Sequence, residues 1–268
     1  MLKKCLTIAG SDCSGGAGIQ ADLKTFSALG TYGMSCICAL TAQNTKEVSM
    51  VENISQVMIT AQLRAIYDDI VPDAVKTGML STAETVDTVS TFLETLHPSN
   101  LVVDPVMVAT SGARLLDEDA VHLYRTKLIP LASIVTPNVP EAEVLAGMKV
   151  QTKEDMKQAA LKIMEIAPKA VLIKGGHAVQ TATDVLYNGY EFIVYEEKKI
   201  ETKNTHGTGC TLSSAIAALL AQNYSLEEAV QQAKSYLTGA IKAAALHSPG
   251  HGYGPVSHFW FYKNPWRK

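Results

Sequence analysis

Short apolar runs alternate with amphipathic stretches along most of this 268-residue chain, and this alternation limits the possible folds most strongly. The apolar runs carry few polar positions on either face, as strands of a parallel sheet that is covered on both sides do. The stretches between them place apolar residues at helical spacing. The repeated strand–helix order predicts a doubly wound α/β sheet with helices on both faces. The predicted strands are 6–9, 35–40, 74–77, 101–103, 134–135 and 171–173, and the predicted helices are 17–29, 55–69, 82–96, 118–128, 153–166, 212–221 and 226–246.

One segment departs from this alternation. Residues 183–200 alternate polar and apolar side chains around Asn188-Gly189, a dipeptide favoured in two-residue hairpin turns. We expect antiparallel strands at 185–187 and 191–195, at one edge of the sheet. No repeat or linker divides the chain, so the simplest organisation is a single domain over residues 1–268.

Composition excludes several classes of partner. The net charge is −3, and no basic tail or long charge run is present, so neither nucleic acid nor an acidic membrane surface is an expected partner. The apolar run 5–9 is too short for a signal peptide, and no segment approaches the roughly 18 apolar residues of a membrane span. The five cysteines form no C-x-x-C pair, which argues against a disulfide framework or a zinc site. We therefore expect a cytoplasmic protein.

Polar clusters follow most of the predicted strands. In open α/β sheets, ligands bind beyond the carboxyl ends of the strands. Because parallel strands end at the same side of the sheet, we expect these clusters to share one edge and to form the functional site. They are 10–12, 41–44, 77–79, 104–106, 136–138 and 174–176.

A glycine-rich turn, Asn204-Thr205-His206-Gly207-Thr208-Gly209-Cys210-Thr211, opens into the small apolar run 212–220. Its glycines allow backbone N–H groups to converge, and the following helix adds its free N-terminal donors and the positive end of its dipole. The turn is therefore a candidate anion hole at Gly207, Thr208, Gly209 and Cys210. A thiol at a helix start is more easily ionised, which we expect of Cys210. The alternative is an ordinary loop before a core helix.

A second glycine-rich segment, Gly15-Gly16-Ala17-Gly18, opens the first predicted helix. It fits the dinucleotide pattern G-x-G-x-x-A only in part, because the glycines come six residues after the strand and no acidic residue closes the second strand. It lacks the lysine of a phosphate-binding Walker loop, so we interpret it as a flexible flap or a pocket wall. Asp22, one turn further on, is either a contact for a substrate hydroxyl or a first-turn carboxylate favoured by the helix dipole.

Four further side chains are candidates for binding. The carboxamide of Gln43 carries a donor and an acceptor and can read the edge of a heteroaromatic ring, or it is a turn residue. Asn138 and Glu141 form either a helix-capping pair or part of a site in which Glu141 holds hydrated magnesium. Lys174, at the end of a predicted strand, suits a nucleotide phosphate. His177 and His206 have no third ligand at metal spacing, so we expect loop histidines.

Together these motifs resemble the ribokinase-like superfamily, and within it the kinases of hydroxymethylpyrimidine and its phosphate in thiamin biosynthesis. The resemblance runs nearly end to end and implies a three-layer α/β/α sandwich with a mostly parallel central sheet. The matching segments are 7–12 with 15–22, 39–45, 76–79, 104–107, 136–143, 174–177, 206–212 and 250–255.

The resemblance implies transfer of the γ-phosphoryl group of ATP to 4-amino-5-hydroxymethyl-2-methylpyrimidine and then to its monophosphate. It implies Mg²⁺ and a homodimer. By matching position, Gln43 and Asp22 would contact the pyrimidine, with Gly10, Met79 and Val106 lining it. Lys174, Asn138 and Thr208 would bind ATP, Glu141 would hold the metal, and Gly207 to Cys210 would form the catalytic anion hole.

Two alternatives remain open. Related kinases of pyridoxal share most of these motifs but tend to carry a second cysteine in the lid after Asp-Pro-Val-Met, whereas this chain reads Val108-Ala109-Thr110-Ser111-Gly112. The other is a ligand-sensing domain without catalysis, against which the joint presence of Lys174, Asn138, Glu141 and the glycine turn argues. Sugar kinases carry Asp where this chain has Cys210, which leaves the general base open.

Overall fold

A single nine-stranded sheet runs through the part of the chain that the computed structural model describes, residues 1–107, 118–175 and 181–262. Its spatial order is β3-β2-β1-β4-β5-β6-β7-β8-β9. In chain order the strands are β1 (Lys4–Asp12), β2 (Tyr32–Gln43), β3 (Val48–Asn53), β4 (Ala74–Thr77), β5 (Leu101–Val103), β6 (Ile134–Val135), β7 (Val171–Gly175), β8 (Thr181–Tyr187) and β9 (Phe192–Lys198).

The middle of the sheet is parallel and its edges are antiparallel. Strands β2, β1, β4, β5, β6 and β7 pair in parallel in that order. Strand β3 is antiparallel to β2 at one edge, and the hairpin β8–β9 continues antiparallel from β7 at the other. The predicted parallel sheet and the predicted edge hairpin around Asn188-Gly189 are both confirmed.

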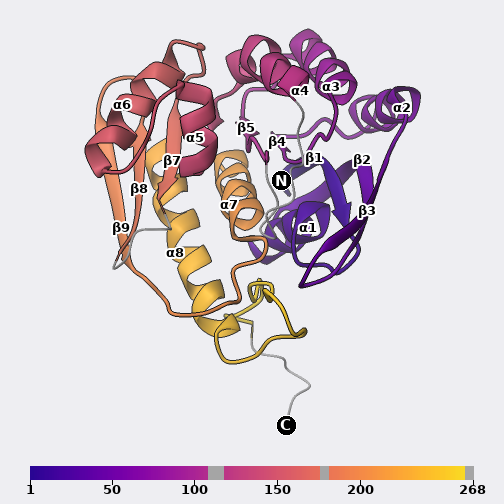
Figure 1. Cartoon of the computed structure of the whole chain (residues 1–268). Helices are drawn as coiled ribbons and strands as arrows, with labels where there is room; N and C mark the ends of the chain where they lie inside the picture. The colour runs from indigo at the N-terminus through magenta and orange to yellow at the C-terminus, as the bar shows by residue number, and fades with distance from the viewer. Residues whose placement is uncertain (108–117, 176–180, 263–268) are drawn as a thin grey trace.

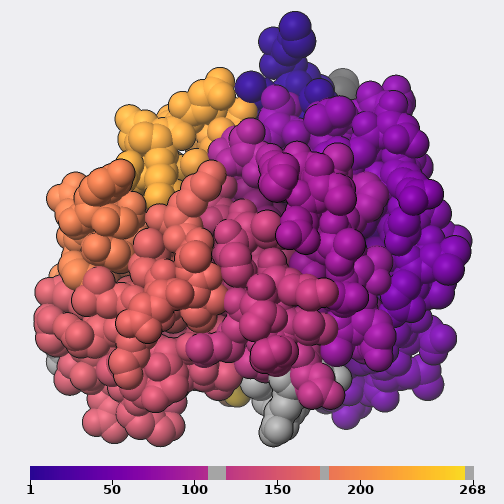
Figure 2. Space-filling model, turned by 90° about the horizontal axis from the view of Figure 1, so that it is seen from above, coloured from indigo at the N-terminus to yellow at the C-terminus, as the bar shows by residue number. Residues whose placement is uncertain are grey.

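Helices cover both faces of the sheet (Figure 1). Strand residues alternate between two cores: Leu101 and Val103 face the first, and Val102 faces the second. Seen from above, the colour passes from purple through magenta to orange across the molecule, as the strand order requires (Figure 2). The first core is covered by α2 (Gln56–Tyr67), α3 (Ala83–Leu96), α4 (Glu118–Leu123), α5 (Val139–Ala146) and α6 (Lys153–Met164), and the second by α1 (Gly18–Ala28), α7 (Thr208–Ala221) and α8 (Leu226–Ala244).

Four elements differ from the prediction. Strands β1 and β2 continue to Asp12 and Gln43, so the polar clusters expected to follow them form their last residues. Strand β3 was not predicted, because it is largely exposed and shows no alternating burial. The predicted helix 118–128 is α-helical only to Leu123, widens into a π-helical turn (Tyr124–Leu128) and then tightens into a 3₁₀ turn (Ile129–Leu131).

Helix α7, whose first turn lies at the site, is buried along most of its length. Every residue from Thr211 to Ala221 is buried, and the helix packs against β1, β4 and β5. This packing fixes its first turn at the edge of the sheet where these strands end. Within the described ranges, no helix combines the length and the apolarity that crossing a membrane requires.

Candidate active site

The carboxyl ends of the six parallel strands meet at one edge of the sheet, as the polar clusters predicted. The backbone N–H of Gly10 donates to the carbonyl oxygen of Met79 at 3.1 Å, which joins the ends of β1 and β4. The N–H of Asp104 donates to the carbonyl of Thr77 at 3.0 Å, which joins the ends of β4 and β5. Side chains that follow these strands therefore share one site.

The turn before α7 adopts a shape that requires glycine. Gly207 caps the helix with φ of 78°, in the left-handed region, and a Cβ there would collide with the carbonyl oxygen of Gly16. The first-turn amides of Gly209 and Cys210 have no carbonyl partner within the helix. Thr208 is held by its hydroxyl, which donates to the Thr205 carbonyl at 3.0 Å. The predicted glycine turn therefore presents helix N-terminal donors at the strand ends.

Lys174, at the end of β7, lies next to this turn. A Cβ on Gly209 would lie 3.4 Å from Lys174 Nζ and 3.8 Å from Asp104 Oδ2. Lys174 Nζ donates to Asp104 Oδ1 at 2.8 Å. Burial lowers the pKa of Lys174, but the charges of Asp104 and Glu141 outweigh it and raise that pKa, so the ammonium keeps its proton at neutral pH. A positive charge thus stands beside the free amides.

Asp104 is the buried acceptor at the centre of the site. Its side chain accepts from the Ser213 hydroxyl at 3.1 Å and from the Thr136 hydroxyl at 3.3 Å, besides Lys174. Burial raises its pKa, but Lys174 and Lys76 outweigh burial and hold the pKa below the usual range. Asp104 is therefore ionised and orients Lys174.

Glu141 and Asn138 form the capping pair that the sequence left open. Asn138 Oδ1 accepts from the Glu141 N–H at 2.9 Å, and Glu141 Oε2 accepts from the Asn138 N–H at 2.8 Å. Burial raises the pKa of Glu141 to about 7, with Lys174 opposing that rise and Asp104 adding to it. A buried carboxyl whose pKa is raised by burial and by Asp104 is stabilised in its ionised form by a further cation, and carboxylate oxygen is a ligand that magnesium prefers, so Glu141 fits a hydrated magnesium ion.

Asp22 lies behind the site rather than in it. Its side chain is fully buried, and its oxygens accept from the hydroxyls of Thr7 and Ser214, each at 2.6 Å. Lys76 Nζ lies 3.0 and 2.9 Å from the same two oxygens. This corrects the expectation that Asp22 contacts the substrate directly, because its oxygens are already occupied by buried donors. Its direct partner is Lys76, a residue that the sequence analysis did not assign to the site.

Cys210 is harder to ionise than a free thiol, contrary to the expectation for a helix start. Burial raises its pKa to about 11, while Lys76 and a hydrogen bond from the Gly18 backbone act in the opposite direction. The nearby carboxylates of Asp22 and Asp104 add to the rise. The expectation is wrong because burial outweighs the helix dipole, and at neutral pH Cys210 is a neutral thiol.

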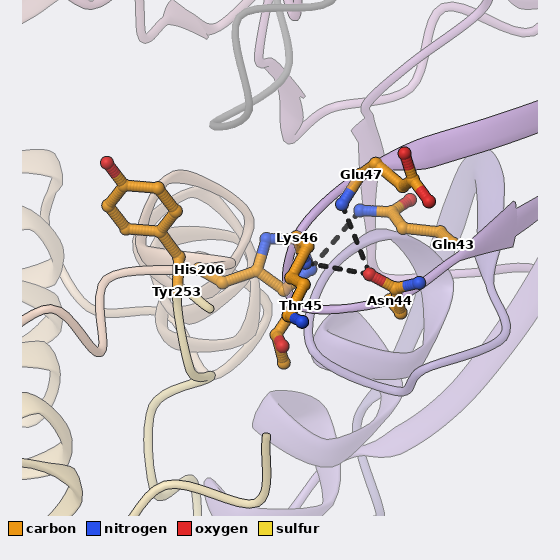
Figure 3. A pocket seen from close by; sticks show the side chains of 7 residues that line it. All are labelled: Gln43, Asn44, Thr45, Lys46, Glu47, His206 and Tyr253. Atoms are coloured by element: carbon orange, nitrogen blue, oxygen red, sulfur yellow. Dashed lines mark hydrogen bonds between the residues drawn. The ribbon is translucent and has the colours of Figure 1, made fainter. Parts of the chain in front are cut away.

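Gln43 and His206 face each other in a pocket between the end of β2 and the glycine turn (Figure 3). Gln43 Nε2 lies 3.3 Å from His206 Nε2, and His206 Nε2 lies 2.8 Å from Asp12 Oδ2. The C-terminal segment closes the pocket, since the Tyr253 N–H donates to the Thr45 carbonyl at 2.7 Å. The lining residues are Gln43, Asn44, Thr45, Lys46, Glu47, His206 and Tyr253.

The remaining predicted contacts lie at the same edge. Gly10 is buried, and a Cβ there would lie 2.5 Å from Cε of Met79, so Met79 packs directly over it. Met79 and Val106 are half-buried, as wall residues would be. The predicted lid, 108–115, and His177 lie outside the described residues.

Sequence reasoning gave no individual role to three buried charged residues, Lys76, Asp104 and Asp12, although Asp12 and Asp104 lie in the predicted polar clusters 10–12 and 104–106. Lys76 lies inside the predicted apolar strand 74–77 and Asp104 follows the strand 101–103, and both are unusual places for a charge. Their partners lie 54 and 70 residues away in sequence, and local patterns carry no information about such pairs.

The chain matches known proteins over most of its length. A family model described as phosphomethylpyrimidine kinase matches residues 12–257. A hydroxymethylpyrimidine/phosphomethylpyrimidine kinase of Rhizobium meliloti is 51% identical over 95% of this chain and 96% of its own length. The thiamine biosynthesis bifunctional protein of Geobacter sulfurreducens is 48% identical over 94% of this chain, which spans only 51% of that longer protein.

A solved structure shares the whole architecture. The Bacillus subtilis pyridoxal kinase in complex with ADP superimposes with a TM-score of 0.90 at 39% identity, over 97% of this chain and 99% of that one. The predicted ribokinase-like three-layer fold is confirmed.

Proposed function

This chain belongs to the phosphomethylpyrimidine kinase family, and we propose that it transfers the γ-phosphoryl group of ATP to 4-amino-5-hydroxymethyl-2-methylpyrimidine and to its monophosphate. The chain is thus a phosphotransferase of thiamin biosynthesis. The observation that best supports this function is the position of Lys174 Nζ beside Gly209, at the first turn of α7. A cation and free amides meet there, as transfer of a phosphoryl group requires.

In the first reaction, the hydroxymethyl oxygen forms a bond to the γ-phosphorus, the bond from that phosphorus to the β–γ bridging oxygen breaks, ADP leaves, and the hydroxyl proton passes to water or to a phosphate oxygen. In the second, an oxygen of the monophosphate forms the bond to the γ-phosphorus, and ADP leaves in the same way. The transition state is loose, so positioning and charge stabilisation dominate. We assign the backbone amides of Gly209 and Cys210 as hydrogen-bond donors to the oxygens of the transferred phosphoryl group. Gly207 and Thr208 fix the turn that positions these amides. Removing one such preorganised donor typically costs about 10²–10³-fold in kcat.

Lys174 and Asn138 are proposed to bind ATP. The Lys174 ammonium is oriented by Asp104 and carries a full charge toward the polyphosphate. Asn138 is paired with Lys174 along the backbone, which keeps the two side by side. Glu141, with Asp104 behind it, would hold Mg²⁺. When bound, the metal supplies positive charge that offsets charge on the phosphates.

The neutral thiol of Cys210 is a poor general base. A loose transition state keeps most of the proton on the attacking hydroxyl until late, so a strong base contributes little early in the reaction. We therefore assign Cys210 a role through its backbone amide.

Gln43 is proposed to read the pyrimidine edge, with Gly10, Met79 and Val106 as walls. Its amide offers one acceptor and two donor hydrogens, which match the ring nitrogen and amino group of an aminopyrimidine. Asp22 contributes indirectly, as the counter-ion of Lys76 under the site.

A second candidate is phosphorylation of pyridoxal, which the 0.90 TM-score to the Bacillus subtilis pyridoxal kinase favours. The two activities differ in the ring and share the phosphoryl site. Comparing kcat/KM for hydroxymethylpyrimidine, its monophosphate and pyridoxal, with ADP release followed by a coupled assay, separates them. The proposal expects both pyrimidines to be the better substrates, and a higher kcat/KM for pyridoxal would overturn it.

We also propose a homodimer that works in the cytoplasm. Large apolar side chains are exposed around the edge strand β3, where the backbone can pair with a second copy. ATP as cosubstrate and five free thiols suit the cytoplasm. Sedimentation of the wild type and of Met50→Asp tests the dimer, since the variant is expected to be monomeric. The exposed side chains are Leu40, Met50, Val51, Val57 and Met58.

A further inference from the structure

A buried ion pair lies beside the strand that carries Lys174. Lys234, in the middle of α8, places its ammonium 2.7 Å from Asp184 Oδ2, and the two side chains are only 6% and 9% exposed. The same ammonium donates to the carbonyl oxygen of Ala182 at 2.8 Å. The pair therefore joins α8 to β8, and none of the contacts proposed for the reaction involves it.

The other oxygen of Asp184 holds the end of β7. Asp184 Oδ1 accepts from the backbone N–H of Gly175 at 3.0 Å, one residue after Lys174. Strands β7 and β8 pair so that Asp184 lies directly opposite Lys174. The strands come so close here that a Cβ on Gly175 would lie 2.2 Å from the carbonyl oxygen of Thr183. The contact thus belongs to a tightly fitted strand end.

Lys174 is bracketed by backbone contacts on both sides. Its own N–H donates to the carbonyl of Pro137 at 2.8 Å, on the β6 side. The next N–H, that of Gly175, donates to Asp184 on β8. These contacts fix the point from which the lysine side chain starts, and Asp104 fixes its ammonium at 2.8 Å. The direction of the ammonium therefore depends on Asp184 as well as on Asp104.

We propose that Asp184 is a positioning residue for nucleotide binding, with Lys234 as its counter-ion. Asp184 fixes the Gly175 N–H and so the end of β7, from which the Lys174 ammonium reaches the polyphosphate of ATP. Lys234 keeps the buried carboxylate paired, because an unpaired buried charge destabilises a fold strongly. Asp184 acts through the backbone, since its side chain is buried and both of its oxygens are occupied. This inference rests on the proposed function, in which Lys174 binds ATP.

Removing the acceptor leaves the Gly175 N–H without its partner at a buried strand end. A buried donor without a partner is costly, so the strand end shifts toward another acceptor or toward water. Lys174 shifts with it. A hydrogen bond between an ammonium and a phosphate depends on distance and direction, so the affinity for the nucleotide falls.

Two double variants separate the acceptor from the ion pair. Asp184→Asn/Lys234→Met and Asp184→Leu/Lys234→Met both remove the two charges, and asparagine and leucine are similar in size. Only asparagine keeps an oxygen that accepts from the Gly175 N–H. Replacing a buried ion pair by neutral side chains is often tolerated, so we expect both variants to fold.

Calorimetric titration with β,γ-methylene ATP and Mg²⁺, without any pyrimidine, measures the nucleotide affinity. We expect the leucine variant to bind about tenfold more weakly than the wild type, on the scale of one charge-assisted hydrogen bond, and the asparagine variant to bind within about threefold of the wild type. The KM for ATP should follow the same order, whereas the KM for hydroxymethylpyrimidine should change by less than about twofold in either variant.

Lys153→Met is the control for loss of a lysine near this edge of the sheet. It removes an exposed ion pair with Glu196 on β9, and it should change the nucleotide affinity by less than about twofold.

Hydrogen exchange of the Gly175 amide, followed by NMR, observes the contact itself. The geometry predicts slow exchange in the wild type and in the asparagine variant, and faster exchange in the leucine variant. Fast exchange in the wild type, equal nucleotide affinities of the two double variants, or equal rises in both KM values would each overturn the inference.

Thermal unfolding identifies a variant that does not fold. In that case Asp184→Thr and Asp184→Val, each with Lys234→Met, form a second pair of equal size in which only threonine keeps an acceptor. If the wild type binds the nucleotide but phosphorylates neither pyrimidine, the proposed substrate is wrong and the inference stands. If the wild type is an active pyrimidine kinase and the two double variants bind the nucleotide equally, the inference alone fails.

Discussion

The ammonium of Lys76 lies 3.0 and 2.9 Å from the two carboxylate oxygens of Asp22, and neither side chain is exposed to solvent. The pair sits beneath the first turn of α7, where Ser214 donates to Asp22 and Cys210 lies close to Lys76. Burial lowers the pKa of Lys76, but Asp22 outweighs burial and raises that pKa well above its usual value. A full ion pair is therefore buried under the proposed phosphoryl site.

Lys76→Met should destabilise the protein strongly, because it leaves the charge of Asp22 buried without its partner. The expected loss in the free energy of unfolding is about 3–5 kcal/mol, the usual cost of breaking a buried pair. Denaturant unfolding of Lys76→Met, Asp22→Asn and the double variant measures it. The double variant should lose less stability than the sum of the losses in the two single variants. A loss in the double variant equal to that sum would contradict the pairing.

Gly209→Val should reduce kcat at least as much as Cys210→Ala. A side chain at Gly209 reaches Lys174 Nζ, 3.4 Å from the Cβ position, and displaces the cation from the free amides. Cys210→Ala keeps its backbone amide and removes only a thiol that is neutral at pH 7. We expect a loss of about 10²–10³-fold for Gly209→Val. Steady-state kinetics decide the order, and a far greater loss for Cys210→Ala would show that the thiol itself acts.

Gln43→Leu should raise the KM for the pyrimidine and leave that for ATP nearly unchanged. Leucine keeps the size of the side chain but removes the donor and acceptor that read the ring. Loss of one or two hydrogen bonds to the substrate corresponds to about 10–100-fold in KM. Measuring both KM values tests this. Equal increases in the KM for the pyrimidine and for ATP would show that Gln43 does not bind the pyrimidine specifically.

Glu141 should make stability depend on pH between about 4.5 and 7. Burial raises its folded-state pKa to about 7 from the usual 4.5, with Lys174 opposing and Asp104 adding to the rise. Its contribution to stability is therefore complete below pH 4.5 and is lost as the pH rises through 7, by about 3 kcal/mol at most.

Glu141→Gln keeps the cap, since glutamine also serves in a capping box, and should abolish this loss. Denaturant unfolding at pH 4.5, 6 and 8, which are chosen conditions, measures the difference from the wild type. Glu143→Gln, on the same helix, is the control, because hydrogen bonds from Lys149 and the Val150 backbone hold the pKa of Glu143 below its usual value. A constant difference between Glu141→Gln and the wild type across this range would contradict the account.

Much of the fold could be predicted because its strands are buried on both faces and its helices are amphipathic. The predicted strand 101–103 is β5, and every residue in it is buried. Asn188-Gly189 lies in the turn between β8 and β9, as a dipeptide favoured in hairpin turns predicts. Strand β3 could not be predicted in this way. It is held by backbone pairing with β2 rather than by burial, so its side chains show no periodic pattern.

For the site too, residues marked by local sequence features could be predicted, whereas contacts between distant segments could not. Gly207, Gly209 and Lys174 were identified because glycine at a helix start and lysine at a strand end are local features. Asp12 and His206 were not paired in advance, because they are 194 residues apart and meet only through the order of the strands. The expectation for Cys210 failed because the effect of the helix start is readable in sequence, whereas its burial is not.

The most direct test of the central claim is a structure of the enzyme with hydroxymethylpyrimidine, ADP, Mg²⁺ and a metal fluoride that mimics the moving phosphoryl group. The account expects the fluoride within hydrogen-bond reach of the Gly209 and Cys210 amides, with Lys174 on the phosphates and Gln43 on the pyrimidine ring. A fluoride bound away from the first turn of α7 would contradict it.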